Sequence, residues 1–470
     1  MESYIHLYKT NSDFTASYNG PDYKEPWLSL TEEGMKVNYN KPKLTAITFD
    51  NITWVTDVPA TGGTATKDNC TFEVNGIYDN GTSVDISSDV TVTGELAVPS
   101  STAEQRHEAG QLTLTASYGE FTATGNVTVY QAADFSTKPL TFKISSPGTI
   151  NWAASNRYLT KTIEYKLNNG EWTSITSNME GVKITVNADD KIQFRGNNAA
   201  YSTSSSYYST FKGSTAGLEI EGNIMSLINP TDFSTLTALS SDYTFNYLFK
   251  GCTGLTSTKN LILPATTLTQ YCYSGMFYGC TSLTTVPSNL LPATTLANGC
   301  YYEMFYGCTS LTIPPELPAM TLASNCYQYM FYGCRSLTTA PELPANTLAD
   351  SCYDGMFYGC TSLTTAPKKL PATTLADSCY STMFDGCTSL TTAPQLPATT
   401  LANYCYSYMF NGCTKLNYIK CLAIDISASY CTNTWVDGVA SNGTFVKASS
   451  MTSWKTGTSG IPSGWTVQNA

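Results

Sequence analysis

Sixteen cysteines are the side chains in this 470-residue sequence with the widest range of possible chemistry. Thiols pair as disulfides, ligate zinc or act as nucleophiles. Most of them fall into two regular series in the second half of the chain, and Cys70 and Cys421 lie outside both. The first series, in which each cysteine follows a glycine, comprises Cys252, Cys280, Cys308, Cys334, Cys360, Cys387 and Cys413. The second series comprises Cys272, Cys300, Cys326, Cys352, Cys379, Cys405 and Cys431. Their even spacing makes them part of a repeat and not of one compact site.

A cysteine that recurs at a core position acts as a small apolar filler. We expect free buried thiols, as synthesis in the cytosol favours, and the alternative is a ladder of disulfides between neighbouring repeats. The sequence has no Cys-x-x-Cys pair and only two histidines, His6 and His107. We therefore expect no zinc site and no other metal.

The remaining polar residues form no pattern that predicts catalysis. Gly-x-Ser-x-Gly, the P-loop and the dinucleotide fingerprint are absent from the sequence. The adjacent carboxylates Glu32 and Glu33, and likewise Asp189 and Asp190, would point apart in a strand and are expected to be solvated. We predict that the protein is not an enzyme and has no catalytic residue and no cofactor.

The cysteines belong to a tandem repeat whose clearest copy begins at residue 333. The Gly-Cys pairs that open successive copies are 26 to 28 residues apart, and self-similarity at such a period is typical of a solenoid. Cys352, Met356 and Cys360 would share one stripe of a short helix at 352–360. Thr-rich strands are predicted at 363–366 and 374–376. Stacked copies would bury their apolar stripes against each other in one continuous core.

The repeat block resembles the BspA-type leucine-rich repeats of surface proteins from gut anaerobes and of their phages. The residues that carry the resemblance are the Phe-x-Gly-Cys-x-x-Leu runs, such as 277–283, and the Leu-Pro that follows. The resemblance covers about residues 251–470 and implies adhesion and recognition, not catalysis. Further upstream, the runs at 78–82 and 114–129 resemble bacterial Ig-like domains, which usually serve as spacers.

We predict a mainly β chain with short helices, in which β-sandwich domains precede a leucine-rich-repeat solenoid. Residues 1–43 would be an N-terminal docking arm. Residues 44–133 contain several short alternating strands, which is typical of a β-sandwich, and are predicted to be the Ig-like domain. Residues 134–215 would form a second β domain. Residues 216–470 would form the BspA-like solenoid with atypical caps at its ends.

The arm has too few apolar residues to form its own core. Trp27, Leu28 and Leu30 stand among polar and turn residues, so they are expected to anchor the arm on another surface. We predict that the arm docks into a larger assembly. The alternatives are a flexible tail and a strand of the domain that follows.

Tyrosine occupies the outward position of several repeats. In the helix predicted at 352–360, Tyr358 faces away from the cysteine stripe, whereas Asp385 and Asn411 take this place in later copies. An exposed row of tyrosines is amphipathic contact area that suits recognition. The alternative is that the tyrosines only cover the flank of the solenoid. The predicted binding surface comprises Tyr278, Tyr306, Tyr332, Tyr358, Tyr302, Tyr329 and Tyr408.

Composition restricts the class of function further. The formal net charge of −11 argues against nucleic-acid binding, and the absence of a long apolar run argues against membrane insertion. The first ten residues show no export signal, which a phage structural protein released by lysis does not need. We predict a non-enzymatic phage virion surface protein, docked to other virion structural proteins by its arm. Its repeats would attach to a host-cell glycan or protein. The alternatives are a bacterial cell-surface adhesin whose signal is missing from this sequence, and a purely architectural virion decoration protein.

Overall fold

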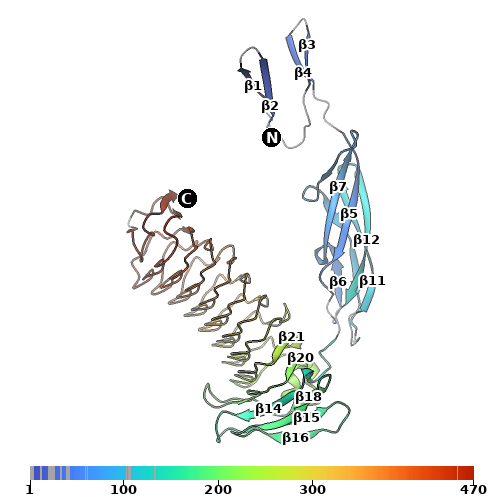
Figure 1. Cartoon of the computed structure of the whole chain (residues 1–470), viewed down its shortest axis with the longest axis vertical. Coiled ribbons are helices and arrows are strands. Elements are labelled where there is room, and N and C mark those ends of the chain that lie inside the picture. The colour runs from blue at the N-terminus through green and yellow to red at the C-terminus, as the bar shows by residue number, and fades with distance from the viewer. Residues whose placement is uncertain are drawn as a thin grey trace. The chain divides into compact units, whose positions relative to one another are not determined.

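The computed structural model describes residues 43–470 except 59, 61, 102, 104–106, 132, 133 and 453, together with four earlier strands (Figure 1). The chain divides into two compact units, Met1–Asp134 and Phe135–Ala470. The four early strands form two antiparallel hairpins, β1 (Ile5–Thr10) with β2 (Asp13–Tyr18) and β3 (Trp27–Thr31) with β4 (Gly34–Asn38). The predicted anchors Trp27, Leu28 and Leu30 fall on β3. Their side chains lie outside the described part, so the docking arm stays a prediction.

Unit 1 has two three-stranded antiparallel sheets that contribute to one apolar core. Their strand orders are β5-β7-β8 and β12-β11-β9, and β6 pairs with β10. The elements are β5 (Leu44–Trp54), β6 (Gly63–Thr66), η1 (Lys67–Asn69), β7 (Cys70–Tyr78), β8 (Ser83–Asp85), β9 (Thr91–Thr93), β10 (Glu95–Val98), β11 (His107–Tyr118) and β12 (Phe121–Gln131). Because side chains alternate along a strand, Leu112, Leu114 and Ala116 of β11 all point inward, where they join Ile47 and Val74 in the core. The assignment to the Ig-like domains stays a prediction.

Unit 2 begins with a six-stranded sheet of order β16-β15-β18-β13-β20-β21. Its strands are β13 (Leu140–Ser146), β15 (Thr162–Leu167), β16 (Thr173–Thr176), β18 (Lys191–Gly196), β20 (Gly217–Asn223) and β21 (Leu255–Ile262). Neighbours are antiparallel except β20 and β21, whose parallel pairing starts the stack of repeats. A second sheet, of three strands, has the order β17-β14-β19. Its strands are β14 (Gly148–Ala154), β17 (Val182–Val186) and β19 (Ser209–Thr210), and the 3-10 helices η2 (Ile224–Leu227) and η3 (Phe233–Thr235) follow β20.

One hydrophobic core extends through unit 2 from Leu140 to Trp465. The ring of Phe211, in the β part, stacks on Phe249 at 5.7 Å, and Phe249 stacks on Phe277 of the repeats at 5.5 Å. The core therefore crosses the boundary predicted between residues 215 and 216. At the far end, β22 (Tyr418–Cys421), β23 (Thr444–Lys447) and β24 (Thr466–Asn469) pair in parallel and finish the stack.

The helix predicted at 352–360 is wrong, because the structure forms consecutive turns there. Every fourth residue of these turns has a left-handed backbone, with φ of 53° at Ser351, 59° at Gly355 and 67° at Gly359. A period of four residues is close to the 3.6 residues of a helical turn. Both place residues i, i+4 and i+8 on one side, which is why the cysteine stripe suggested a helix. No helix in the described residues has the length and apolar character needed to span a membrane.

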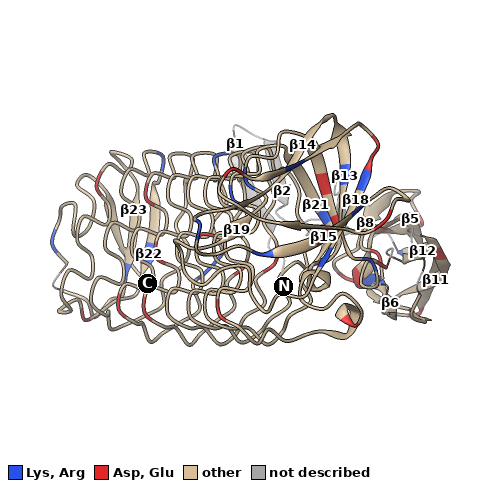
Figure 2. Ribbon diagram, turned by 90° about the horizontal axis from the view of Figure 1, so that it is seen from below, with Lys and Arg blue, Asp and Glu red and all other residues tan. Residues whose placement is uncertain are grey.

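Backbone hydrogen bonds in the turns run both within and between repeats. The Met356 N–H donates to the Tyr353 carbonyl at 3.2 Å, whereas the Gly355 N–H donates to the Ser381 carbonyl of the next repeat at 2.8 Å. Each repeat is thus tied to the next as in a parallel sheet. The strand predicted at 363–366 is reduced to a single bridge at Thr365, and the segment 374–376 has no strand structure. Charged side chains are few along the stacked turns (Figure 2).

Candidate functional site

Four of the predicted tyrosines stand in one stack along the turns of successive repeats. The ring centroids are 4.5 Å apart between Tyr278 and Tyr306, 4.4 Å between Tyr306 and Tyr332, and 4.6 Å between Tyr332 and Tyr358. The ring planes are within 3° of parallel. The spacing follows from the backbone, since the Gly307 N–H donates to the Tyr332 carbonyl at 2.7 Å and holds the repeats at the separation of paired strands. We call these four residues the tyrosine row.

The rings of the tyrosine row cover one another's faces, which leaves ring edges and hydroxyl groups for contact with a ligand. All four residues are half-buried. The Tyr306 hydroxyl is hydrogen-bonded to those of Tyr278 and Tyr332. Burial, together with the neighbouring Tyr332 and Tyr278, raises the pKa of Tyr306 to about 12, so this phenol is protonated at neutral pH. The row therefore presents a line of hydroxyl donors and acceptors bordered by apolar ring edges.

Charged residues occupy the equivalent position at both ends of the row. The Lys250 ammonium lies 4.7 Å from the ring centre of Tyr278, which is a cation–π arrangement. At the other end, the Asp385 carboxylate accepts a hydrogen bond from the Asn411 side chain at 3.0 Å. Burial raises the pKa of Asp385 to about 6, and the charge of this carboxylate raises the pKa of Tyr358. The row thus begins beside a cation and ends beside an acid.

A second group of side chains meets the row at Tyr332. The Tyr329 ring contacts Tyr332 edge-to-face at 6.0 Å and Tyr302 edge-to-face at 6.1 Å. Next to Tyr302, the Glu303 carboxylate accepts a hydrogen bond from the Tyr247 hydroxyl at 3.0 Å and another from Tyr302. Burial raises the pKa of Glu303, and these two hydrogen bonds oppose the rise. The structure therefore brings the predicted residues Tyr302 and Tyr329 to the row and adds a partly buried carboxylate.

Sequence reasoning missed two charged members of this site. Lys250 precedes the Gly-Cys pair of its repeat, as each tyrosine of the row does, so an alignment of the repeats carried the signal. Glu303 gave no such signal, because its contact with Tyr247 reaches across two repeats. Tyr408 is not part of the group. It is 39% exposed, and no ring contact involves it among the described residues.

Tyr329 has a left-handed backbone that bulky residues rarely adopt, with φ of 55°. Its ring lies over Gly355 of the next repeat, where an added Cβ atom would come within 2.3 Å of the ring. Tyr247 and Tyr271 cover Gly275 and Gly299 in the same way. Glycine in one repeat thus makes room for a tyrosine from the repeat before it. Strain of this kind persists only where packing or function holds it.

All sixteen cysteines are free thiols, and every one except Cys70 is buried. Six of the seven thiols that follow glycine also donate a hydrogen bond to a phenylalanine carbonyl. Cys360 donates to the Phe331 carbonyl at 3.1 Å and Cys334 to the Phe305 carbonyl at 3.2 Å. The thiol adds a second hydrogen bond to each carbonyl, which already accepts from a backbone N–H, and an aliphatic filler could not make it. Burial raises the pKa of both thiols, so neither is an activated nucleophile. In the described part of the chain, no cluster of histidine, cysteine and acidic side chains is arranged to hold a metal ion.

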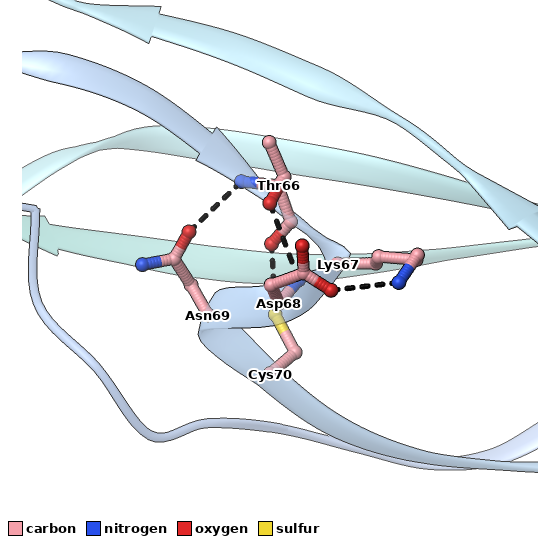
Figure 3. Close-up of polar contacts among 5 residues, drawn as sticks. All are labelled: Thr66, Lys67, Asp68, Asn69 and Cys70. Carbon is pink, nitrogen blue, oxygen red and sulfur yellow. Dashed lines mark hydrogen bonds and ion pairs between the residues drawn. The ribbon is translucent and has the colours of Figure 1, made fainter. Parts of the chain in front are cut away.

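Cys70 lies apart from the repeats, directly after η1 in unit 1 (Figure 3). A capping box shapes this turn: the Thr66 hydroxyl accepts from the Asp68 N–H at 3.2 Å, and the Asn69 side chain accepts from the Thr66 N–H at 2.9 Å. The Cys70 sulfur is 3.9 Å from the Thr66 carbonyl oxygen. Burial raises the pKa of the Cys70 thiol as well. Cys70 is the first residue of β7, and no second titratable side chain is bonded to its sulfur in this close-up.

Residues 220–312, 240–364 and 324–436 match the model of the BspA type leucine-rich repeat region, of which six copies are found. This part of the chain is therefore a BspA-type leucine-rich repeat region, as the Phe-x-Gly-Cys-x-x-Leu runs predicted. Repeats of this family are binding modules, often related to surface adhesion, and are not typically enzymatic. No curated protein and no solved structure matches the chain. The tyrosine row lies entirely within the matched repeats.

Proposed function

We propose that this chain is a non-enzymatic attachment protein, displayed on the surface of a phage virion, that binds a host-cell glycan with the tyrosine row. The observation that carries the proposal is the row itself: four parallel rings, stacked 4.4–4.6 Å apart, that belong to four consecutive repeats. The BspA-type repeats support display on a surface. We further propose that the arm at 1–43 docks the chain to other virion structural proteins.

The fold of the repeats does not require tyrosine in the row. The Gly386 N–H donates to the Asn411 carbonyl at 2.8 Å, as the Gly307 N–H does to the Tyr332 carbonyl at 2.7 Å. The backbone bond between repeats therefore forms with an amide side chain as well as with a phenol. Tyrosine adds rigid amphipathic contact area with little loss of side-chain entropy on binding. The presence of tyrosine at these positions therefore supports a role in contact with a partner.

The geometry of the row favours a glycan over an apolar protein surface. Since the ring faces are covered by one another, a ligand meets ring edges and the hydroxyls of residues such as Tyr306 and Tyr332. A sugar chain offers many hydroxyl groups that can pair with a line of phenols. Lys250 at one end adds attraction for an acidic sugar, because its ammonium is near the row.

The test changes Tyr306, Tyr332 and Tyr358 together to Ser in the full chain. Binding is measured on an array of bacterial surface polysaccharides and on a panel of whole bacterial cells. We expect the triple variant to lose attachment. A second triple variant, with Phe at the same positions, keeps the rings and removes the hydroxyls, and we expect it to lose most of the attachment too.

The matched control changes three tyrosines that are exposed elsewhere, Tyr118, Tyr158 and Tyr207, to Ser. We expect this control to bind as the unchanged chain does. Undiminished binding by the first variant would contradict the proposal. Failure of the unchanged chain to bind any polysaccharide or cell would instead favour the architectural role. Immunogold labelling of virions and of bacterial cells distinguishes a virion protein from a cell-surface adhesin.

A further inference from the structure

A pocket of about 550 Å³ opens between two adjacent repeats, on the proline-rich segments 312–318 and 338–344. Apolar side chains form most of its lining, including Ile313, Pro314 and Pro341. No residue of the tyrosine row lines it. We call it the proline pocket, and the site described above makes no use of it.

Ile313 departs from what the other repeats carry at its position. Thr285, Thr339, Thr365 and Thr392 are the equivalent residues in four other copies, whereas the first copy has Ser257 and the last has Tyr418. Ile313 is 72% exposed, so its side chain gains little from folding of the chain itself. The threonines show that the fold accepts a polar residue here. Together with the half-buried Pro314 and Pro341 of the same lining, the exposed isoleucine forms a contiguous apolar surface that suits contact with another molecule.

Pro314 removes one backbone hydrogen-bond donor between neighbouring repeats at this place. In three other copies the equivalent residue donates its N–H to the next repeat: Thr258 to Thr285 at 2.9 Å, Ala340 to Thr365 at 2.9 Å and Ala393 to Tyr418 at 3.0 Å. Proline has no N–H. Pro314 therefore cannot make the matching bond to the Thr339 carbonyl, which lines the pocket.

The lining of the proline pocket offers backbone carbonyl groups and negative charge. Its prolines contribute carbonyl groups but no N–H. The N–H groups of Glu316 and Ala340 are already bonded to other carbonyls, at 2.8 and 2.9 Å. Glu316 and Glu342 add two exposed carboxylates, and none of the described lining residues is basic. Charged side chains are otherwise sparse on the repeats (Figure 2). A ligand that fits must supply apolar surface, hydrogen-bond donors and positive charge.

We propose that the proline pocket binds an extended peptide segment of a partner protein, in which an apolar side chain lies next to an arginine or lysine. The apolar side chain covers Ile313 and the prolines. The cationic side chain approaches Glu316 and Glu342, and its N–H groups suit the Thr339 carbonyl. This surface is separate from the tyrosine row, so the chain would have two recognition sites of different chemistry.

The test titrates the full chain with a fluorescent hexapeptide of alternating arginine and leucine, and with the same peptide carrying glutamate in place of arginine. Fluorescence anisotropy gives the Kd. We expect the cationic peptide to bind and the acidic one not to bind. Ile313→Thr combined with Pro314→Ala gives the pocket the residues of neighbouring copies, so this variant should fold. We expect it to raise the Kd at least roughly tenfold, as loss of a central contact does.

Charge is tested separately with Glu316→Gln combined with Glu342→Gln, which should raise the Kd and weaken its salt dependence. The matched control, Glu120→Gln combined with Glu180→Gln, removes the same charge from exposed positions outside the pocket. We expect it to keep the original affinity. Thermal unfolding shows whether each variant is folded.

Any of these results of the binding tests would overturn the proposal: no binding of the cationic peptide, unchanged affinity in the Ile313→Thr and Pro314→Ala variant, or equal losses in the two glutamate pairs. Sedimentation that shows self-association, abolished by the Ile313 and Pro314 changes, would make a second copy the occupant and overturn it as well. The triple serine variant of the tyrosine row should bind the peptide normally. Failure of the peptide test therefore leaves the attachment proposal standing.

Discussion

Gly355→Ala tests whether the repeats make room for the tyrosine that precedes them. With φ of 59° at this position, alanine costs about 1–2 kcal/mol for the left-handed backbone. The new Cβ would also meet the Tyr329 ring at 2.3 Å, so the ring must move. Moving it breaks edge-to-face contacts with Tyr332 and Tyr302, each of which contributes about 0.5–1.5 kcal/mol. The free energy of unfolding should fall by roughly 2–5 kcal/mol in all.

Gly359→Ala is the matched control, because φ is 67° there and the nearest atom to an added Cβ, Gly333 Cα, is 4.0 Å away. In this variant only the cost of the left-handed backbone lowers the free energy of unfolding. Scanning calorimetry of the full chain should show a clearly lower Tm for Gly355→Ala than for Gly359→Ala. In a Tyr329→Ser background, Gly355→Ala should cost only as much as the control. Equal Tm shifts for the two glycines, or no coupling between positions 355 and 329, would refute the reasoning.

Three other predictions concern a carboxyl group, the thiols and the arm. Because the pKa of Asp385 is about 6 in the folded chain against an ordinary 3.8, its contribution to stability is greatest below pH 4 and is lost as the pH rises through 6. Asp385→Asn, which copies Asn411, should therefore raise the free energy of unfolding at pH 8, by no more than about 1–2 kcal/mol after solvent screening, and not at pH 4. A stabilisation that is the same at both pH values, measured by thermal unfolding, would contradict this. Thiol titration in denaturant without reductant should find most of the sixteen cysteines free, and fewer than about half would indicate oxidised pairs. A chain that begins at Leu44 should keep its circular dichroism spectrum but lose incorporation into virions, and unfolding of unit 1 would instead show that the arm belongs to it.

The repeat phase predicted that Tyr278, Tyr306, Tyr332 and Tyr358 share a flank, and the structure stacks these rings although the helix behind the argument is absent. A helix and a run of four-residue turns both place positions i and i+4 on one side. What separates them is the left-handed residue in every turn. Gly355 could have revealed it, but Tyr329 and Glu303 occupy the equivalent position in other copies. Their types gave no hint of a left-handed backbone.

Other features depend on contacts between repeats. They could not be predicted from the sequence of one repeat. The hydrogen bond from Tyr247 to Glu303 joins residues two repeats apart. The thiol hydrogen bond of Cys360 depends on where the Phe331 carbonyl lies, so the sequence predicted only a small filler. By contrast, the missing N–H of Pro314 can be read from the sequence alone. The proline pocket beside it depends on the geometry of both neighbouring segments.

Equivalent positions of the repeats share one backbone conformation. Comparing their side chains therefore distinguishes residues that the fold requires from residues that suit a partner. Bonds between copies form equally well beside Tyr332 and beside Asn411, so the outward side chain is free to vary. Tyrosine nevertheless fills four consecutive copies, which suits an elongated ligand that contacts each in turn. The Ile313-Pro314 pair occurs in one copy only, which suits a single side chain. Two departures of such different extent are best explained by two partners, and a variant that disables one surface should leave the other at full strength.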